Sequence, residues 1–149
     1  MELKVVQASA RELGLIIQPW KVADAGGFEP VFAAVNKEPP NALYVVQGTL
    51  MSNNQTRTVA FALKNKLPSM YNRRQDVEAG AFISYGADEA NSYRLIASYV
   101  DRILKGANAA DLPIEQPKKF ELAINLKTAK QIGLTIPPNV LARADKVIR

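Results

Sequence analysis

The apolar positions of the chain follow two spacings that alternate along the sequence. Runs spaced three and four residues apart are typical of helices with one buried face, and short continuous apolar runs are typical of buried strands. Gly14, Gly106 and Gly133 follow three of the helical runs and suit the left-handed residue that closes a helix. Helices are predicted over residues 3–13, 28–35, 52–63, 89–105, 127–132 and 138–148, and strands over residues 15–22, 42–46, 69–71, 81–85 and 120–126.

The alternation of helices and strands predicts an α/β fold. Strands that follow one another through helices are joined by right-handed crossovers and therefore run parallel, with helices on both faces of the sheet. The run Ala42–Val46 is continuously apolar, as in a strand covered on both faces, whereas Phe120–Leu126 alternates as in a half-exposed strand. We therefore expect a Rossmann-like, three-layer parallel sheet.

Polar side chains are concentrated where the predicted strands end, above all within Leu67–Gly86. Ligands of parallel sheets bind at the carboxyl ends of the strands. Gln47 and Thr49 follow one predicted strand, and Asn72 and Arg73 follow the next. These residues are candidate ligand contacts, and the alternative that they are ordinary exposed loop residues stays open.

The candidate side chains suit an anionic or aromatic ligand. A guanidinium of the pair Arg73–Arg74 could clamp a carboxylate, although two exposed loop arginines would look the same in sequence. Ser84 and Tyr85 precede Asp88 and the predicted long helix, whose amino-terminal end could face an anion; alternatively Asp88 only caps the helix and Tyr85 anchors it in the core. Trp20 could stack on a ring or simply pack.

The composition excludes several classes of active site. The chain has 149 residues, 48% of them apolar, and contains neither Cys nor His. Thiol nucleophiles, imidazole acid–base catalysis and zinc sites built from these residues are therefore excluded. Asp76, Glu78 and Asp88 are the remaining catalytic candidates, and no motif relates them. We expect no enzyme activity, no metal site and no cofactor.

The charge distribution gives little support for a nucleic-acid partner. The net charge is +5, but the basic residues are scattered apart from the pairs Arg73–Arg74 and Lys118–Lys119. No apolar run approaches the roughly 20 residues of a membrane span, and the first residues lack the pattern of a secretory leader. The sequence as written predicts a soluble chain without a targeting signal, which would be cytoplasmic.

Motifs in the second half of the chain carry a family resemblance. Phe120–Lys130, Gly133–Pro138 and Leu141–Asp145 match closely, and the match continues backward through Val77–Gly80 and Ser84–Gly86. The first 70 residues match mainly in their pattern of helices and strands. In these motifs the chain resembles the ABC-transporter substrate-binding proteins of the tryptophan- or tyrosine-binding type.

The resemblance implies a type I periplasmic binding fold, in which two Rossmann-like lobes close on a small molecule. On that model residues 1–76 belong to the second lobe, residues 77–117 supply a crossing strand and the long helix of the first lobe, and residues 118–149 return to the second. The implied function is solute binding for an ABC uptake transporter, with an aromatic amino acid or similar metabolite as ligand and an ABC permease as partner. The implied location is the periplasm or the cell surface.

The family is longer than this chain by a leader and a complete first lobe, so the chain resembles a carboxyl-terminal half. In such a half the strand Ala81–Tyr85 would lose most of its sheet, and its unpaired backbone groups predict a homodimer through strand edges. Two other functions stay open. The fold also serves as the effector-binding sensor domain of regulators, and a dimerising remnant without ligand binding is the third hypothesis.

Overall fold

The computed structural model describes residues 2–149, which divide into two units, one up to Pro39 and one over Pro40–Arg149. The first unit contains the helices α1 (Glu2–Glu12) and α2 (Phe28–Lys37) and a 3₁₀ turn η1 (Ala25–Gly27). Both helices were predicted from the apolar spacing. Gly14 closes α1 with a φ of 68°, the left-handed conformation expected there.

The strand predicted after α1 is wrong. Residues 15–22 have no strand structure, and Ile16 is 96% exposed. A short apolar run predicts a strand only if a neighbouring strand pairs with it, and no described backbone pairs with this segment. Trp20 therefore lies in an irregular segment.

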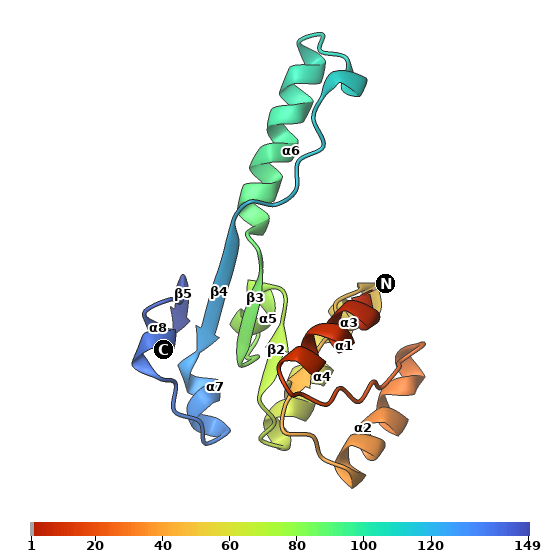
Figure 1. Cartoon of the computed structure of the whole chain (residues 1–149), viewed down its shortest axis with the longest axis vertical. Helices are drawn as coiled ribbons and strands as arrows, with labels where there is room; N and C mark the ends of the chain where they lie inside the picture. Colours follow the sequence, from red (N-terminus) through yellow and green to blue (C-terminus); the bar gives the residue numbers. More distant parts are fainter. Residues whose placement is uncertain (1) are drawn as a thin grey trace. The chain divides into compact units, whose positions relative to one another are not determined.

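The second unit is built on one five-stranded sheet, in the order β1-β2-β3-β4-β5, of which Figure 1 labels β2 to β5. Its strands are β1 (Leu43–Tyr44), β2 (Ser69–Tyr71), β3 (Ile83–Ala87), β4 (Phe120–Asn125) and β5 (Lys146–Ile148). Its helices are α3 (Thr49–Asn53), α4 (Gln55–Lys64), α5 (Arg74–Glu78), α6 (Glu89–Leu104), α7 (Leu126–Gln131) and α8 (Pro138–Leu141), with a 3₁₀ turn η2 (Ala109–Asp111). None of the helices within residues 2–149 is long and apolar enough to cross a membrane.

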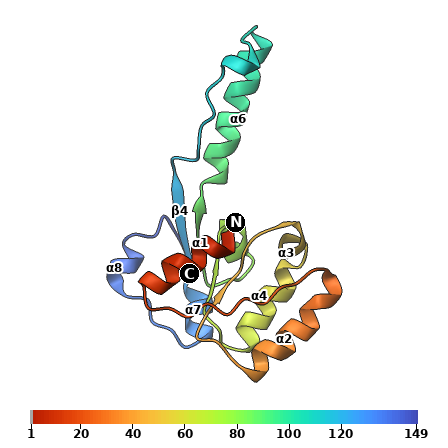
Figure 2. The same cartoon turned by 45° about the vertical axis from the view of Figure 1, so that its right-hand side comes forward.

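The sheet is mostly parallel, as the predicted α/β class requires, but one pair departs from the prediction. β1, β2 and β3 run parallel, and so do β4 and β5, whereas β3 and β4 are antiparallel. The reason lies in the connection: β3 leads into α6, and the chain returns along α6 to the same end of the sheet before β4 begins (Figures 1 and 2).

Several predicted segments change length or type. The strand predicted over Ala42–Val46 is reduced to β1, which is the sheet edge and leaves Tyr44 and Val46 more than 40% exposed. The helix predicted to reach Ile148 stops at Leu141, and the last apolar residues form β5 because β4 offers them a parallel partner. β4 was expected to be half exposed, yet its last three residues are all buried.

The core of the second unit forms where helices pack on the strands. Val59 of α4 lies against Tyr71 of β2, and Phe82 packs with Ala129 and Ile132 at α7. The segment Arg74–Glu78, for which no helix was predicted, is the short helix α5, which packs on β3 and β4. Because one helical turn shows no periodicity, apolar spacing could not predict α5.

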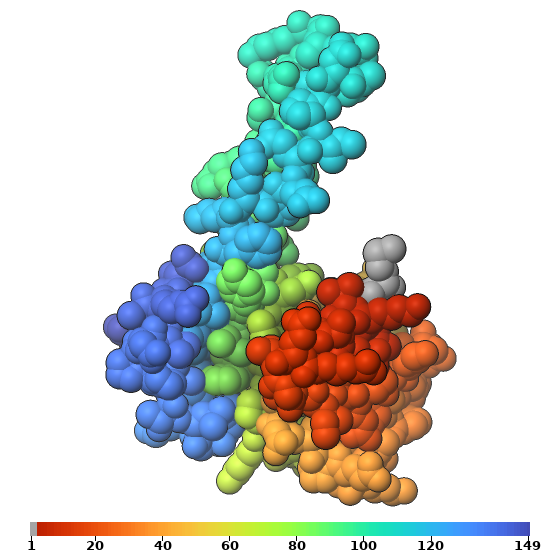
Figure 3. All heavy atoms as spheres, viewed as in Figure 1, coloured from red at the N-terminus to blue at the C-terminus, as the bar shows by residue number. Residues whose placement is uncertain are grey.

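We call α6 and the segment that returns from it, residues 89–119, the arm; Figure 3 shows its atoms standing clear of the rest of the second unit. The long helix was predicted, but its apolar stripe is not buried. The exposed side chains are Tyr93, Ile96, Val100, Ile103 and Leu104, at 44–82%. The predicted loss of partners at Ala81–Tyr85 is wrong, because β2 and β4 pair with β3 on both sides.

Gly86 of β3 lies in close contact with the backbone that follows β2. A Cβ at this position would lie 1.8 Å from the carbonyl oxygen of Asn72. No side chain can be accommodated at that distance without moving the backbone of one strand. Glycine is therefore required where β3 passes the end of β2.

We predict that Gly86→Ala lowers the free energy of unfolding by about 3 kcal/mol, because the new methyl group forces the backbones of residues 72 and 86 apart. Urea unfolding followed by circular dichroism measures the loss. Gly48→Ala is the matched control, since no atom lies within 4 Å of a Cβ there, and it should change stability little. Equal unfolding midpoints for the two variants would contradict the assigned contact.

Asp88 joins the base of the arm to the returning chain. Its carboxylate accepts a hydrogen bond from the backbone N–H of Asn91, which caps α6 as predicted, and pairs with Lys119 Nζ at 2.9 Å. The backbone N–H of Asp88 also donates to the Lys119 carbonyl oxygen. The Lys119 ammonium, followed by the Asn91 N–H, holds the pKa of Asp88 below its ordinary value of 3.8.

The lowered pKa predicts how stability depends on pH. Asp88 stabilises the folded chain above its ordinary pKa, and this contribution is lost as the pH falls through the lower folded-state pKa. Asp88→Asn keeps the cap but removes the charge, so it should lower stability at neutral pH and converge with the wild type in acid. Urea unfolding between about pH 7 and about pH 2.5 tests this. Asp101→Asn, on the exposed side of α6, is the control, and a constant gap between Asp88→Asn and wild type would contradict the prediction.

Candidate functional site

Polar side chains meet at the carboxyl ends of β1 and β2. Gln47 follows β1, Ser52 lies on α3, Arg73 follows β2, and Asp76 lies on α5. Their side chains interact in a closed circuit, which we call the polar ring. The sequence predicted that Gln47 and Arg73 would lie at this edge of the sheet, and the structure places them in one ring.

Each contact of the polar ring has a defined direction. Gln47 Nε2 donates to Asp76 Oδ2 at 2.8 Å, and Ser52 Oγ donates to Gln47 Oε1 at 3.3 Å. Ser52 Oγ in turn accepts from Arg73 Nη1 at 3.1 Å. The ring closes electrostatically, because Arg73 Nε lies 3.9 Å from Asp76 Oδ2, too far for a hydrogen bond.

Asp76 is the buried member of the ring. Its residue is 1% exposed, and its second carboxylate oxygen accepts a 2.6 Å hydrogen bond from Gln55 Nε2 of α4. Burial raises the pKa of Asp76 above its ordinary value, while the Gln55 amide and the charge of Arg73 oppose that rise. An ionised carboxylate is tolerated in this position because both oxygens have donors.

The structure distinguishes two arginines that the sequence could not. Arg74 Nε lies 3.0 Å from Glu78 Oε1, and Arg74 Nη1 lies 3.2 Å from Glu121 Oε1. These carboxylates, Glu121 first, raise the pKa of Arg74. Arg73 belongs instead to the polar ring, and one third of its side chain is exposed. The two arginines therefore differ in their partners rather than in exposure, and Arg73 is the one that lies in the polar ring.

Carboxylates outnumber cations around Arg73. Glu89, the first residue of α6, lies 3.8 Å from Arg73 Nε and accepts a 2.6 Å hydrogen bond from Gln75 Nε2. Arg73 thus faces two carboxylates, those of Asp76 and Glu89, and the group as a whole carries a net formal charge of −1. A ligand group bound beside Glu89 could therefore be cationic, while the outer edge of the guanidinium suits an anion.

The other predicted ligand residues are not in the polar ring. Thr49 begins α3 and is exposed, and Asn72 is exposed beside Gly86. Ser84 is buried in β3. The ring of Tyr85 is half exposed and stacks on Phe120 with centroids 5.7 Å apart.

Sequence reasoning missed four members of this polar cluster: Ser52, Gln55, Gln75 and Glu89. It considered Asp76 only as a catalytic candidate. Apart from the Ser52–Gln47 bond, which spans five residues, their hydrogen bonds join residues 14–21 positions apart, which no local spacing predicts. One usable signal was the position of Asp76 and Glu89 in the first turns of helices that follow strand ends, where acidic residues are favoured.

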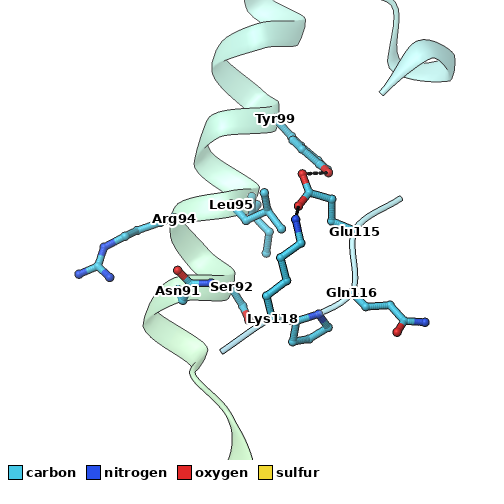
Figure 4. A pocket seen from close by; sticks show the side chains of 10 residues that line it. Asn91, Ser92, Arg94, Leu95, Tyr99, Glu115, Gln116 and Lys118 are labelled. Atoms are coloured by element: carbon cyan, nitrogen blue, oxygen red, sulfur yellow. Dashed lines mark hydrogen bonds and ion pairs between the residues drawn. The ribbon is translucent and has the colours of Figure 1, made fainter. Parts of the chain in front are cut away.

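A separate groove of about 460 Å³ lies along the arm, between α6 and residues 115–118 (Figure 4). Tyr99 Oη donates to the Pro113 carbonyl oxygen at 2.6 Å and lies 3.4 Å from Glu115, and Lys118 Nζ pairs with Glu115 at 2.8 Å. Lys118 holds the pKa of Glu115 below its ordinary value. These polar groups satisfy one another and hold the returning segment on the helix, so we assign the groove a structural role.

Comparison with known proteins places the chain in a family. The family model of the ABC transporter substrate binding protein matches residues 1–148, which confirms the resemblance drawn from the motifs. No curated protein sequence matches at a significant level.

Solved structures confirm the fold. A conserved domain protein from Vibrio cholerae shares 26% identity with a TM-score of 0.87, over 97% of this chain and 49% of its own. The ABC domain from Streptococcus pneumonia in complex with L-Trp shares 24% with a TM-score of 0.86, over 99% and 51%. CD0873 from Clostridium difficile, a ligand-free, open substrate-binding protein with adhesive properties, shares 17% with a TM-score of 0.67, over 98% and 48%. The chain spans about half the length of each protein.

The burial of Asp76 predicts the effect of removing Gln55. Gln55→Met leaves one carboxylate oxygen without its donor, so the pKa of Asp76 rises further and the free energy of unfolding at pH 7 falls by about 2 kcal/mol. The loss should shrink as the pH falls through the folded-state pKa, because a protonated carboxyl needs less solvation. Urea unfolding at several pH values measures it. Gln131→Met, on the exposed end of α7, is the control, and a loss that does not vary with pH would refute the explanation.

Proposed function

The chain belongs to the family of ABC transporter substrate-binding proteins, and we propose that it forms the ligand-binding part of the solute-binding component of an ABC uptake transporter. The observation that carries the proposal is the polar ring at the carboxyl ends of β1 and β2, where parallel sheets bind their ligands. The ring holds hydrogen-bonding groups at the carboxyl ends of these strands, and the partly exposed guanidinium of Arg73 is one of them. The partner in transport is an ABC permease, and the working location is the periplasm or the cell surface.

The ligand in this proposal is an aromatic amino acid or a similar small metabolite. Arg73 supplies the group for its carboxylate, and Glu89 lies close enough to Arg73 to take an ammonium beside it. The L-Trp complex of the structure from Streptococcus pneumonia supports an aromatic amino acid as the first ligand to test.

The proposed contact residues fall into two groups. Gln47 and Arg73 are the inner contacts, because the ring holds them in place. Thr49, Asn72 and Tyr85 stay predictions as outer contacts, and the stacked ring of Tyr85 is the aromatic surface among them. Ser84 was predicted with them, but we do not propose it as a direct contact, because it is as buried as Asp76.

We assign the arm to the first lobe of a two-lobed protein. The division into residues 1–76, 77–117 and 118–149 remains our prediction from the sequence. The exposed apolar stripe of α6 supports it, because an amphipathic helix stabilises a fold by burying that face, and the relatives contain a further half that the chain does not span. A homodimer through strand edges also stays a prediction, although the strand from which it was predicted, β3, is paired on both sides.

We predict that L-tryptophan raises the melting temperature of the chain more than tryptamine does, because only the amino acid carries the carboxylate that Arg73 binds. Thermal shift with a panel of amino acids identifies the ligand class, and isothermal titration calorimetry then gives Kd. Arg73→Gln should weaken binding of the best amino acid by about 10- to 100-fold, the loss expected for hydrogen bonds to a charged group.

Arg74→Gln is the matched control, since its guanidinium is held by Glu78 and Glu121, and it should leave Kd nearly unchanged. A panel without any shift, or equal losses for the two arginine variants, would contradict the proposal.

A further inference from the structure

We propose that Asp76 is a positioning residue of the ligand site, whose buried carboxylate orients Gln47 and Arg73 for ligand binding. The proposal rests on the proposed function for the meaning of the site, but the orientation itself can be tested without a ligand. Asp76 is too buried to contact a ligand directly. It acts through Gln47 and Arg73, the two side chains of the ring that contact it.

An ionised carboxylate can only accept hydrogen bonds. Gln47 must therefore turn its NH₂ group toward Asp76 Oδ2, and this turns its carbonyl Oε1 toward Ser52. Ser52 gives its single hydroxyl proton to that carbonyl, so its oxygen is left to accept from Arg73 Nη1. One buried charge thus determines the direction of each hydrogen bond in the ring.

The same charge, together with that of Glu89, attracts the inner edge of the guanidinium. Arg73 Nε lies 3.9 Å from Asp76 and 3.8 Å from Glu89 without a hydrogen bond to either, and one Nη1 proton is used on Ser52. A guanidinium has five N–H groups in a planar fork, so one hydrogen bond at Nη1 and the carboxylate charges beside Nε favour one orientation of the outer edge. An arginine oriented in advance loses less side-chain entropy on binding, which favours affinity.

Three titratable groups face Asp76. Arg73 stabilises its charged form, Glu89 disfavours that form, and Tyr71 lies on the adjoining strand with its pKa raised mainly by burial. Gln55 supplies the second amide donor. When Asp76 gains a proton it becomes a donor itself, so the constraint on the Gln47 amide is released and the attraction for Arg73 is lost.

The test is a pH titration of the whole ¹⁵N,¹³C-labelled chain by NMR. The Asp76 carboxyl carbon, the Nε2 groups of Gln47 and Gln55 and the Nε–H of Arg73 are followed from about pH 7 to about pH 3. We expect the four groups to shift with one shared apparent pKa. Gln47 and Arg73 signals that stay constant while Asp76 titrates, or that follow the carboxyl of Glu89, would overturn the proposal.

Variants separate positioning from stability. In Asp76→Asn the shared titration should vanish, and solvent exchange of the Arg73 Nε–H should accelerate by about tenfold or more, while the amides of β2 and β3 stay protected. Glu78→Gln, an exposed carboxylate on the same helix, is the matched control and should keep the titration. If Asp76→Asn fails to fold, the titration of the wild-type chain still shows whether Gln47 and Arg73 respond to the protonation of Asp76.

L-tryptophan supplies the functional readout. At pH 7, Asp76→Asn should raise its Kd by about tenfold or more and Glu78→Gln should leave it unchanged. Equal Kd values for wild type and Asp76→Asn would overturn the role in ligand positioning. A wild-type chain that binds no amino acid but shows the shared titration would count against the proposed function and support the role of Asp76 in orienting the ring.

Discussion

The burial of one carboxylate governs the arrangement of the polar end of the sheet. Removing Asp76 from water is unfavourable unless donors replace its hydration, and the donors come from the segment after β1 and from α4, with the charge of Arg73 after β2 in support. Three segments far apart in sequence must therefore meet at one point. The side chains that compensate the buried charge also lie at the carboxyl ends of the strands, where the candidate site is. The same contacts therefore stabilise this region and shape the site.

The sequence correctly predicted the elements whose apolar spacing and end residues lie within their own segment. β2 matches its prediction, and α6 begins after its predicted cap and ends before its predicted glycine. Errors occurred where a neighbour decides the outcome. Residues 15–22 have the composition of a strand but no pairing partner, whereas the end of the chain becomes β5 because β4 lies beside it. Propensity is a weak guide wherever pairing or burial depends on a distant segment.

The topology of the sheet made the position of the site predictable from the sequence. The contacts between individual side chains in the site could not be predicted. The ends of parallel strands share one edge of the sheet, so Gln47 and Arg73 could be expected to lie there together. The same rule could not tell Arg73 from Arg74, because the difference depends on Glu121, 47 residues further along the chain. It could not assign Asp76 its buried place either, since that depends on α5, a single turn whose helical character apolar spacing does not reveal.

The ion pair and backbone hydrogen bond between Asp88 and Lys119, which we call the clamp, fix the base of the arm and leave its far end distant from the sheet. α6 has 16 residues, so it extends about 24 Å beyond the clamp. A rotation of only about 10° at its base would displace its far end by about 4 Å, because displacement grows with distance from the pivot. Glu89 sits at that pivot and contacts both Gln75 and Arg73, where the same rotation moves atoms by only a fraction of an ångström. A small rotation at the site would thus be amplified at the opposite end of the arm.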